Sequence, residues 1–154
     1  LTYGPIKLQS EYIRTNFEGT KLTAPIGNFD NDIKAWYINA TWMLTGESYA
    51  DSYKGGVFGR IKPKNNMAMG KDGWGAWEVG VRYSKFDASD FKNMLTNIYT
   101  AEADSWTAGL KWIMTPNARM MLNYIHTDFD TPVLVNGKRS DQENAMVMRA
   151  QYDF

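Results

Sequence analysis

The sequence contains no cysteine, and its other absences narrow the class of protein further. Without cysteine the 154 residues carry no disulfide, thiolate metal ligand or thiol nucleophile, which is compatible with a periplasmic or outer-membrane setting. Seventeen basic residues balance seventeen acidic ones, so bulk charge gives no reason to expect nucleic acid as a partner. No run approaches the roughly 20 apolar residues of a transmembrane helix, so any membrane insertion must use β-strands.

Groups that perform catalysis are also scarce. His126 is the only histidine, and it follows Tyr124 on an apolar register, which favours a membrane interface over a general base. No Ser–His–Asp arrangement can be assembled around it. The glycine-rich residues 55–59 lack the strand-to-helix context of a phosphate-binding loop. We therefore expect no enzyme, no cofactor and no metal site.

The chain has instead a repeated alternation of apolar and polar residues with the period of a β-strand. The clearest run sets Trp36, Ile38, Ala40, Trp42 and Leu44 on one register, with Tyr37, Asn39, Thr41 and Met43 on the other. Similar runs cover residues 6–13, 77–84, 105–114, 120–127 and 146–154. They predict about six strands, each near the roughly 9 to 11 residues that a tilted membrane-spanning strand needs.

The last of these runs, MVMRAQYDF, ends the chain on an aromatic residue. Its apolar register ends with Tyr152 and Phe154, and its polar register ends with Arg149, Gln151 and Asp153. A buried strand of a soluble sheet also alternates, but an aromatic terminus is unusual for a soluble domain. Outer-membrane barrels resemble this pattern, because their final strand commonly ends in Phe and the barrel-assembly machinery reads it. The run favours a transmembrane barrel strand.

The connections between the runs differ in length. Residues 115–118, TPNA, predict a tight turn, because Pro presets one turn dihedral and Asn tolerates a left-handed one. Residues 16–31, 87–103 and 128–143 predict longer polar loops. Short turns on one side and long loops on the other are typical of outer-membrane barrels. If Phe154 is periplasmic, the long loops are extracellular, and residues 46–73 lie on the periplasmic side with TPNA.

About six strands are too few for a transmembrane barrel, since the smallest bacterial ones have about eight. Either residues 46–73 contain two more strands, or the chain continues before Leu1. Residues 46–73 are dense in Gly, Lys, Asn and Asp and alternate only over 57–61, so a strand pair there is a poor fit. The chain also begins without an initiator Met, which predicts a mature product or a fragment. We expect the carboxy-terminal piece of a larger barrel.

Five sequence blocks together resemble the phosphate-selective porin O and P family of Gram-negative outer membranes: WYINATWMLTGES, FGRIKPK, GWGAWEVGVRYSKFD, GLKWIMTPNARMMLNYIHTDFD and ENAMVMRAQYDF. The resemblance implies an all-β antiparallel transmembrane barrel of about 16 strands. It also implies a trimer that conducts anions with a preference for phosphate or polyphosphate. Residues 1–154 would form the carboxy-terminal part of a single outer-membrane barrel domain and supply about its last six strands.

Charged residues on the polar register are the candidates for pore lining. The basic ones suit an anion path, because arginine forks match phosphate oxygens, and the acidic ones would join them in a lumen network. A purely structural ion network is the alternative. A second candidate is the basic run at 60–64, at the lumen mouth or as a solvated turn. The basic candidates are Lys7, Arg82, Lys111, Arg149, Arg60, Lys62 and Lys64, and the acidic ones are Glu11, Glu78 and Asp153.

Aromatic residues near the strand ends predict belts at the two membrane interfaces. They are Trp36, Trp42, Trp77, Tyr83, Trp106, Trp112, Tyr152 and Phe154. The expected partners are small anionic solutes, outer-membrane lipid, the assembly machinery and two further copies in a homotrimer, with no nucleic acid.

Two other classes of protein stay open. A small closed barrel with a structural or adhesion role needs two strands from residues 46–73, and a soluble lipocalin-like barrel needs apolar side chains inward.

Overall fold

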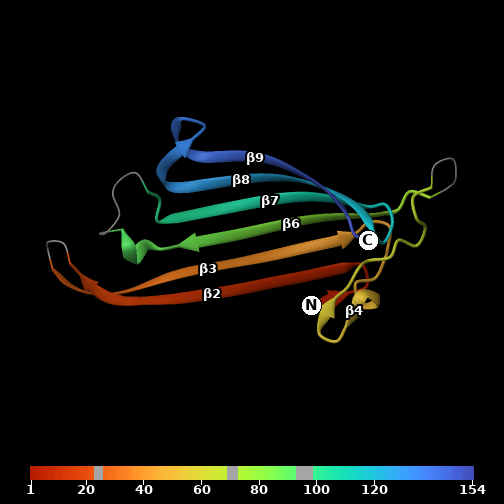
Figure 1. Cartoon of the computed structure of the whole chain (residues 1–154), viewed down its shortest axis with the longest axis horizontal. Coiled ribbons are helices and arrows are strands. Elements are labelled where there is room, and N and C mark those ends of the chain that lie inside the picture. Colours follow the sequence, from red (N-terminus) through yellow and green to blue (C-terminus); the bar gives the residue numbers. More distant parts are fainter. Residues whose placement is uncertain (23–25, 69–72, 93–98) are drawn as a thin grey trace.

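The structure, a computed structural model, describes residues 1–22, 26–68, 73–92 and 99–154 and consists mainly of one antiparallel sheet. The order of its strands is β1-β2-β3-β6-β7-β8-β9, so each long strand pairs with its neighbour along the chain (Figure 1). The short strand is β1 (Thr2–Tyr3), and the long strands are β2 (Ile6–Lys21), β3 (Gly27–Met43), β6 (Ala76–Asp87), β7 (Glu102–Ile113), β8 (Ala118–Val135) and β9 (Lys138–Tyr152).

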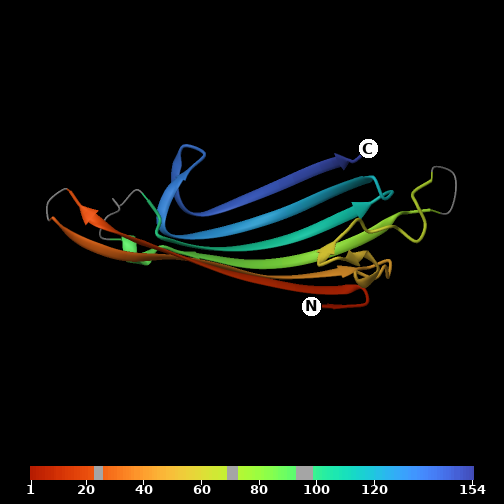
Figure 2. The same ribbon diagram turned by 60° about the horizontal axis from the view of Figure 1, so that its bottom comes forward.

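The six long strands and their registers confirm the predicted alternation. Ile6 pairs with Trp42, and Trp77 pairs with Trp112, so apolar residues of neighbouring strands share one face. The sheet is curved (Figure 2), and no pairing within the described residues joins β9 to β1 or β2. The sheet is therefore open in this chain.

Helical structure in the described part of the chain is limited to two three-residue 3-10 turns, η1 (Ala50–Ser52) and η2 (Ser89–Phe91). None of the helices among these residues is long and apolar enough to span a bilayer.

Two of the three predicted long loops are wrong. Much of residues 16–31 belongs to β2 and β3, which pair as far as Lys21 and Gly27. Residues 128–143 form the ends of β8 and β9, joined through Asn136 and Gly137. The spanning strands are consequently 12 to 18 residues long, rather than near 9 to 11.

The reason for this error is that polar residues continue the strand pairing. Asn16 Nδ2 donates to Asp30 Oδ1 at 2.6 Å, and Arg14 Nη2 lies 2.6 Å from Asp32 Oδ2 across the same pair of strands. In the other hairpin, Asn136 and Gly137 both have positive φ values, 49° and 79°. An Asn-Gly pair of that kind fits a tight two-residue turn between antiparallel strands. The third predicted loop, between β6 and β7, is a longer connection, and its residues 93–98 are not among the described residues.

Residues 44–68, here called the inserted segment, lie at the end of the sheet that also holds the 115–118 turn and both termini (Figure 1). Its only strands are β4 (Tyr53–Lys54) and β5 (Val57–Phe58), a separate two-stranded sheet. The described part of 46–73 thus supplies no spanning strands, and the small closed barrel is not favoured.

The inserted segment packs against the sheet through a small apolar core. Tyr49 is 2% exposed and clusters with Met43, Ala76 and Ile113, with Ile61 packed beside them. Met43, Ala76 and Ile113 belong to the register that carries the polar side chains farther along β3, β6 and β7. The inserted segment therefore covers one end of the polar face of the sheet.

Candidate functional site

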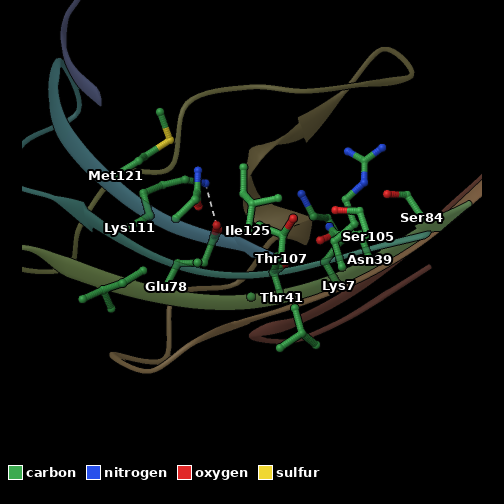
Figure 3. Close-up of a pocket in the computed structure, with 16 residues that line it drawn as sticks. Lys7, Asn39, Thr41, Glu78, Ser84, Ser105, Thr107, Lys111, Met121 and Ile125 are labelled. Carbon is green, nitrogen blue, oxygen red and sulfur yellow. Dashed lines mark hydrogen bonds and ion pairs between the residues drawn. The ribbon is translucent and has the colours of Figure 1, made fainter. Parts of the chain in front are cut away.

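The polar face of the sheet forms a hollow whose wall comes from five strands. This open cavity has a volume of about 500 Å³. The side chains that Figure 3 labels, which come from β2, β3, β6, β7 and β8, point to one side of the sheet. The polar lining residues include Lys7, Asn39, Thr41, Glu78, Arg82, Ser84, Ser105, Thr107, Lys111 and Asn123. Three predicted basic residues and one acidic residue therefore line a common cavity.

Glu78 of β6 is the most enclosed of these charged groups. It is 6% exposed, and its Oε1 accepts a 2.5 Å hydrogen bond from Lys111 Nζ, directly opposite on β7. Its Oε2 accepts a 2.7 Å bond from the Tyr49 hydroxyl, which also lies 2.8 Å from Thr41 Oγ1. Burial raises the pKa of Tyr49 well above its usual 10.0, so the hydroxyl keeps its proton for Glu78.

Lys7 of β2 lies beside this group without an ion pair among the described residues. Its Nζ is 5.0 Å from the ring centroid of Tyr49 and 5.3 Å from that of Phe58. Both aromatic rings come from the inserted segment, and cation–π attraction of this kind holds an ammonium without neutralising it. The inserted segment therefore positions a cation at the border of the cavity.

Arg82 is held in a similar way in the middle of the polar face. Its Cζ lies 3.9 Å from the ring centroid of Tyr37, whose hydroxyl accepts a 3.1 Å hydrogen bond from Gln9 Nε2. None of the ion pairs between described residues involves Arg82. Cation–π attraction holds the guanidinium over the ring and leaves its N–H donors available to an anion.

A second cavity of about 110 Å³ lies between the sheet and the inserted segment. Lys7, Glu78 and Lys111 line it as well as the larger cavity, and Arg60 and Arg119 complete its basic lining. Arg60 Nε and Arg119 Nη2 lie 3.9 and 3.4 Å from Asp153 Oδ2. Arg60 thus reaches the wall of this cavity, whereas Asp153 lies just beyond β9.

The remaining predicted charges lie apart from the Glu78 group. Lys62 and Lys64 line a cavity within the inserted segment, with Arg60, Glu47 and Asp51. Arg149 lies on the polar register of the edge strand β9, opposite Met121. Glu11 lines a fourth hollow together with Arg82. The structure therefore brings Lys7, Glu78 and Lys111 together, with Arg82 in the first cavity and Arg60 in the second. Lys62 and Lys64 share a cavity with Arg60 but not with the other three, and Arg149 lines none of these cavities.

The predicted aromatic residues lie on the opposite, apolar face or at its ends. Trp77 and Trp112 stack with ring centroids 5.3 Å apart at 12°. Farther along the sheet Tyr83 contacts Trp36 and Trp106, with centroids 5.3 and 4.6 Å away. Trp42, Tyr152 and Phe154 are 52%, 65% and 104% exposed. Large apolar side chains left in the open along a whole face need a non-aqueous neighbour.

Sequence reasoning missed three residues of the site. Tyr37 supports Arg82, Tyr49 supports Glu78, and Arg119 lines the second cavity. Arg119 could have been found by counting back two residues from Met121 on the polar register. Tyr37 was visible on the polar register too, but Tyr49 comes from an irregular segment with no periodic signal.

No group of side chains suited to hold a metal ion occurs within residues 1–22, 26–68, 73–92 and 99–154. The site consists of cations, one buried carboxylate, hydroxyls and amides. Such groups bind and steer ions without forming a covalent bond.

A curved antiparallel sheet with charged residues on one face and exposed apolar residues on the other is the wall of a porin-type β-barrel. The chain belongs to the phosphate-selective porin O and P family, whose sequence profile matches residues 1–154. It is 30% identical over 158 residues to Porin O of Pseudomonas aeruginosa, an alignment that covers 98% of this chain and 33% of that protein. The chain therefore spans about a third of the length of this relative. These matches confirm the family resemblance seen in the sequence.

Proposed function

We propose that residues 1–154 supply six strands of a roughly 16-stranded outer-membrane barrel that lets small anions, phosphate above all, diffuse passively. The supporting observation is Arg82, which borders the open cavity, stacks on Tyr37 and has no carboxylate partner among the described residues. A planar guanidinium held in this way matches two phosphate oxygens at once.

The surroundings of the site fit the same proposal. The exposed apolar face would contact outer-membrane lipid of a Gram-negative bacterium, with its two aromatic clusters near the interfaces. The barrel-assembly machinery would insert the chain, and three copies would form the trimer. The barrel would act as a channel with no catalytic step.

The test is a measurement of ion selectivity on the intact barrel in planar bilayers. The variant Arg82→Gln, Lys111→Gln, Arg149→Gln removes three positive charges of the polar register and should lower the anion-to-cation permeability ratio, most visibly at low salt. The matched control is Lys62→Gln with Lys64→Gln, which removes charges that line only the cavity within the inserted segment. A triple variant that keeps the parent's ratio would contradict this assignment.

The variant Arg82→Lys distinguishes the effect of the positive charge at this position from the effect of the planar guanidinium. Lysine keeps the positive charge but loses the planar fork, so the preference for anions should persist while phosphate loses its advantage over chloride. Reversal potentials in chloride and in phosphate gradients measure the two effects. Equal phosphate preference in Arg82→Lys and the parent would remove Arg82 from the phosphate path.

A further inference from the structure

Lys7, Glu78 and Lys111 occupy the junction between the two cavities, because these three residues line both of them. An ion that moves along the polar face toward the inserted segment passes this group. Figure 3 shows Glu78 and Lys111 joined across β6 and β7, with Lys7 and Thr41 on the same side of the sheet. The charge of this junction therefore acts on ions in both cavities.

The junction contains two ammonium groups and one carboxylate, a net charge of one positive unit. Glu78 contacts Lys111 at 2.5 Å and is 6% exposed, so water screens it little. It is also the acceptor for Tyr49, so its position is fixed from both sides. The negative charge of Glu78 lowers the positive electrostatic potential that Lys7 and Lys111 create in the two cavities.

We infer that Glu78 is a specificity-determining residue that sets how tightly the channel holds an anion at the junction of the two cavities. Conduction requires binding that is favourable enough for entry and weak enough for release. Two uncompensated ammonium groups beside a cavity of about 110 Å³ would retain a phosphate, and the buried carboxylate weakens that retention. This inference rests on the proposed anion channel.

The structure offers a charge series that tests the inference. Relative to the parent, Glu78→Gln raises the net charge of the junction by one unit and keeps an acceptor oxygen for Tyr49. Lys111→Gln lowers it by one unit. The double variant restores the parent's charge without the ion pair. If Glu78 acts only as a structural anchor, both single variants disturb the same contact and should change conduction in the same direction.

The measurement is single-channel conductance of the intact barrel against the concentration of inorganic phosphate, together with reversal potentials. Glu78→Gln should lower the half-saturating phosphate concentration about threefold or more, the effect of one charge about 6 Å away in water. It should also shift the reversal potential toward anions. Lys111→Gln should shift both quantities the opposite way, and the double variant should return to the parent.

The results separate this inference from the proposed function. A parent channel without anion preference overturns the proposed function, whereas opposite shifts in the two single variants still support the role of Glu78. An anion-selective parent with unchanged values in Glu78→Gln overturns the inference alone. Shifts of both single variants in one direction overturn it as well.

Discussion

Gly80 of β6 and Gly109 of β7 lie directly opposite one another on the polar face, where both line the large cavity. A Cβ atom on Gly80 would lie 2.9 Å from Thr41 Cγ2, and one on Gly109 would lie 2.6 Å from Asn123 Oδ1. The side chains of Thr41 and Asn123 therefore occupy the space beside the two glycines, and a side chain at either glycine would displace one of them. The width of the hollow therefore depends on two residues that carry no charge.

A large side chain at Gly109 should narrow the channel without changing its selectivity. We expect Gly109→Leu to lower single-channel conductance, because the new side chain enters the cavity, while the anion-to-cation ratio stays at the parent's value. The control is Ala108→Leu, one residue away on the apolar face, which should conduct like the parent. Equal conductance in Gly109→Leu and Ala108→Leu would show that the two faces are assigned the wrong way round.

A charged residue on the apolar face should destabilise the inserted barrel. Val81 is 55% exposed and lies between Ala40 and Ala108 near the middle of the sheet. We expect Val81→Arg to destabilise the inserted barrel by roughly 2 to 4 kcal/mol if this position lies at the bilayer midplane. Thr107→Arg, on the polar face, should cost much less. Denaturant titration in lipid vesicles measures both, and similar losses would refute the assignment of the faces.

The two edges of the sheet should prevent these 154 residues from forming a pore alone. β9 has no partner on its outer side among the described strands, and β2 has only the two residues of β1. Unpaired backbone groups cannot face lipid. We expect residues 1–154 refolded in detergent to show neither heat-modifiable migration nor single-channel currents. Stable conducting monomers would contradict the proposed division of the barrel.

Asp153 should make the attachment of the inserted segment sensitive to acid. The hydrogen bond from Gln151, followed by Arg119 and Arg60, lowers the pKa of Asp153 below its usual 3.8. A lowered pKa stabilises the folded contact above pH 3.8, and this contribution is lost as the pH falls through the lowered value. We expect the contact between Arg60 and Asp153 to weaken in that acidic range.

A spin label at Lys62→Cys reports this change, because the chain has no cysteine of its own. Its mobility should rise when the pH falls below 3.8, and Asp153→Asn should show high mobility at neutral pH with little further change. A label whose mobility follows pH equally in Asp153→Asn would exclude Asp153 as the cause.

The sequence predicts which side chains share the polar face, but it does not predict which of them contact one another. Alternation placed Lys7, Arg82 and Lys111 on one face, because neighbouring side chains in a strand point to opposite sides. It could not pair Glu78 with Lys111, since that contact depends on the register between β6 and β7. Residues 16–31 and 128–143 are predicted as loops because their composition is polar, but in the structure they continue the strands. In the second of these hairpins, Asn136 and Gly137 form the tight turn.

The sequence by itself determined the strand periodicity, the two faces and the family, because these follow from the local order of side chains. The tertiary structure alone decided that residues 44–68 lie over the polar face, where Tyr49 reaches Glu78 and Arg60 reaches Asp153. Contacts between an irregular segment and a sheet have no period along the chain. They arise only when burial of Tyr49 against Met43, Ala76 and Ile113 holds that segment in place.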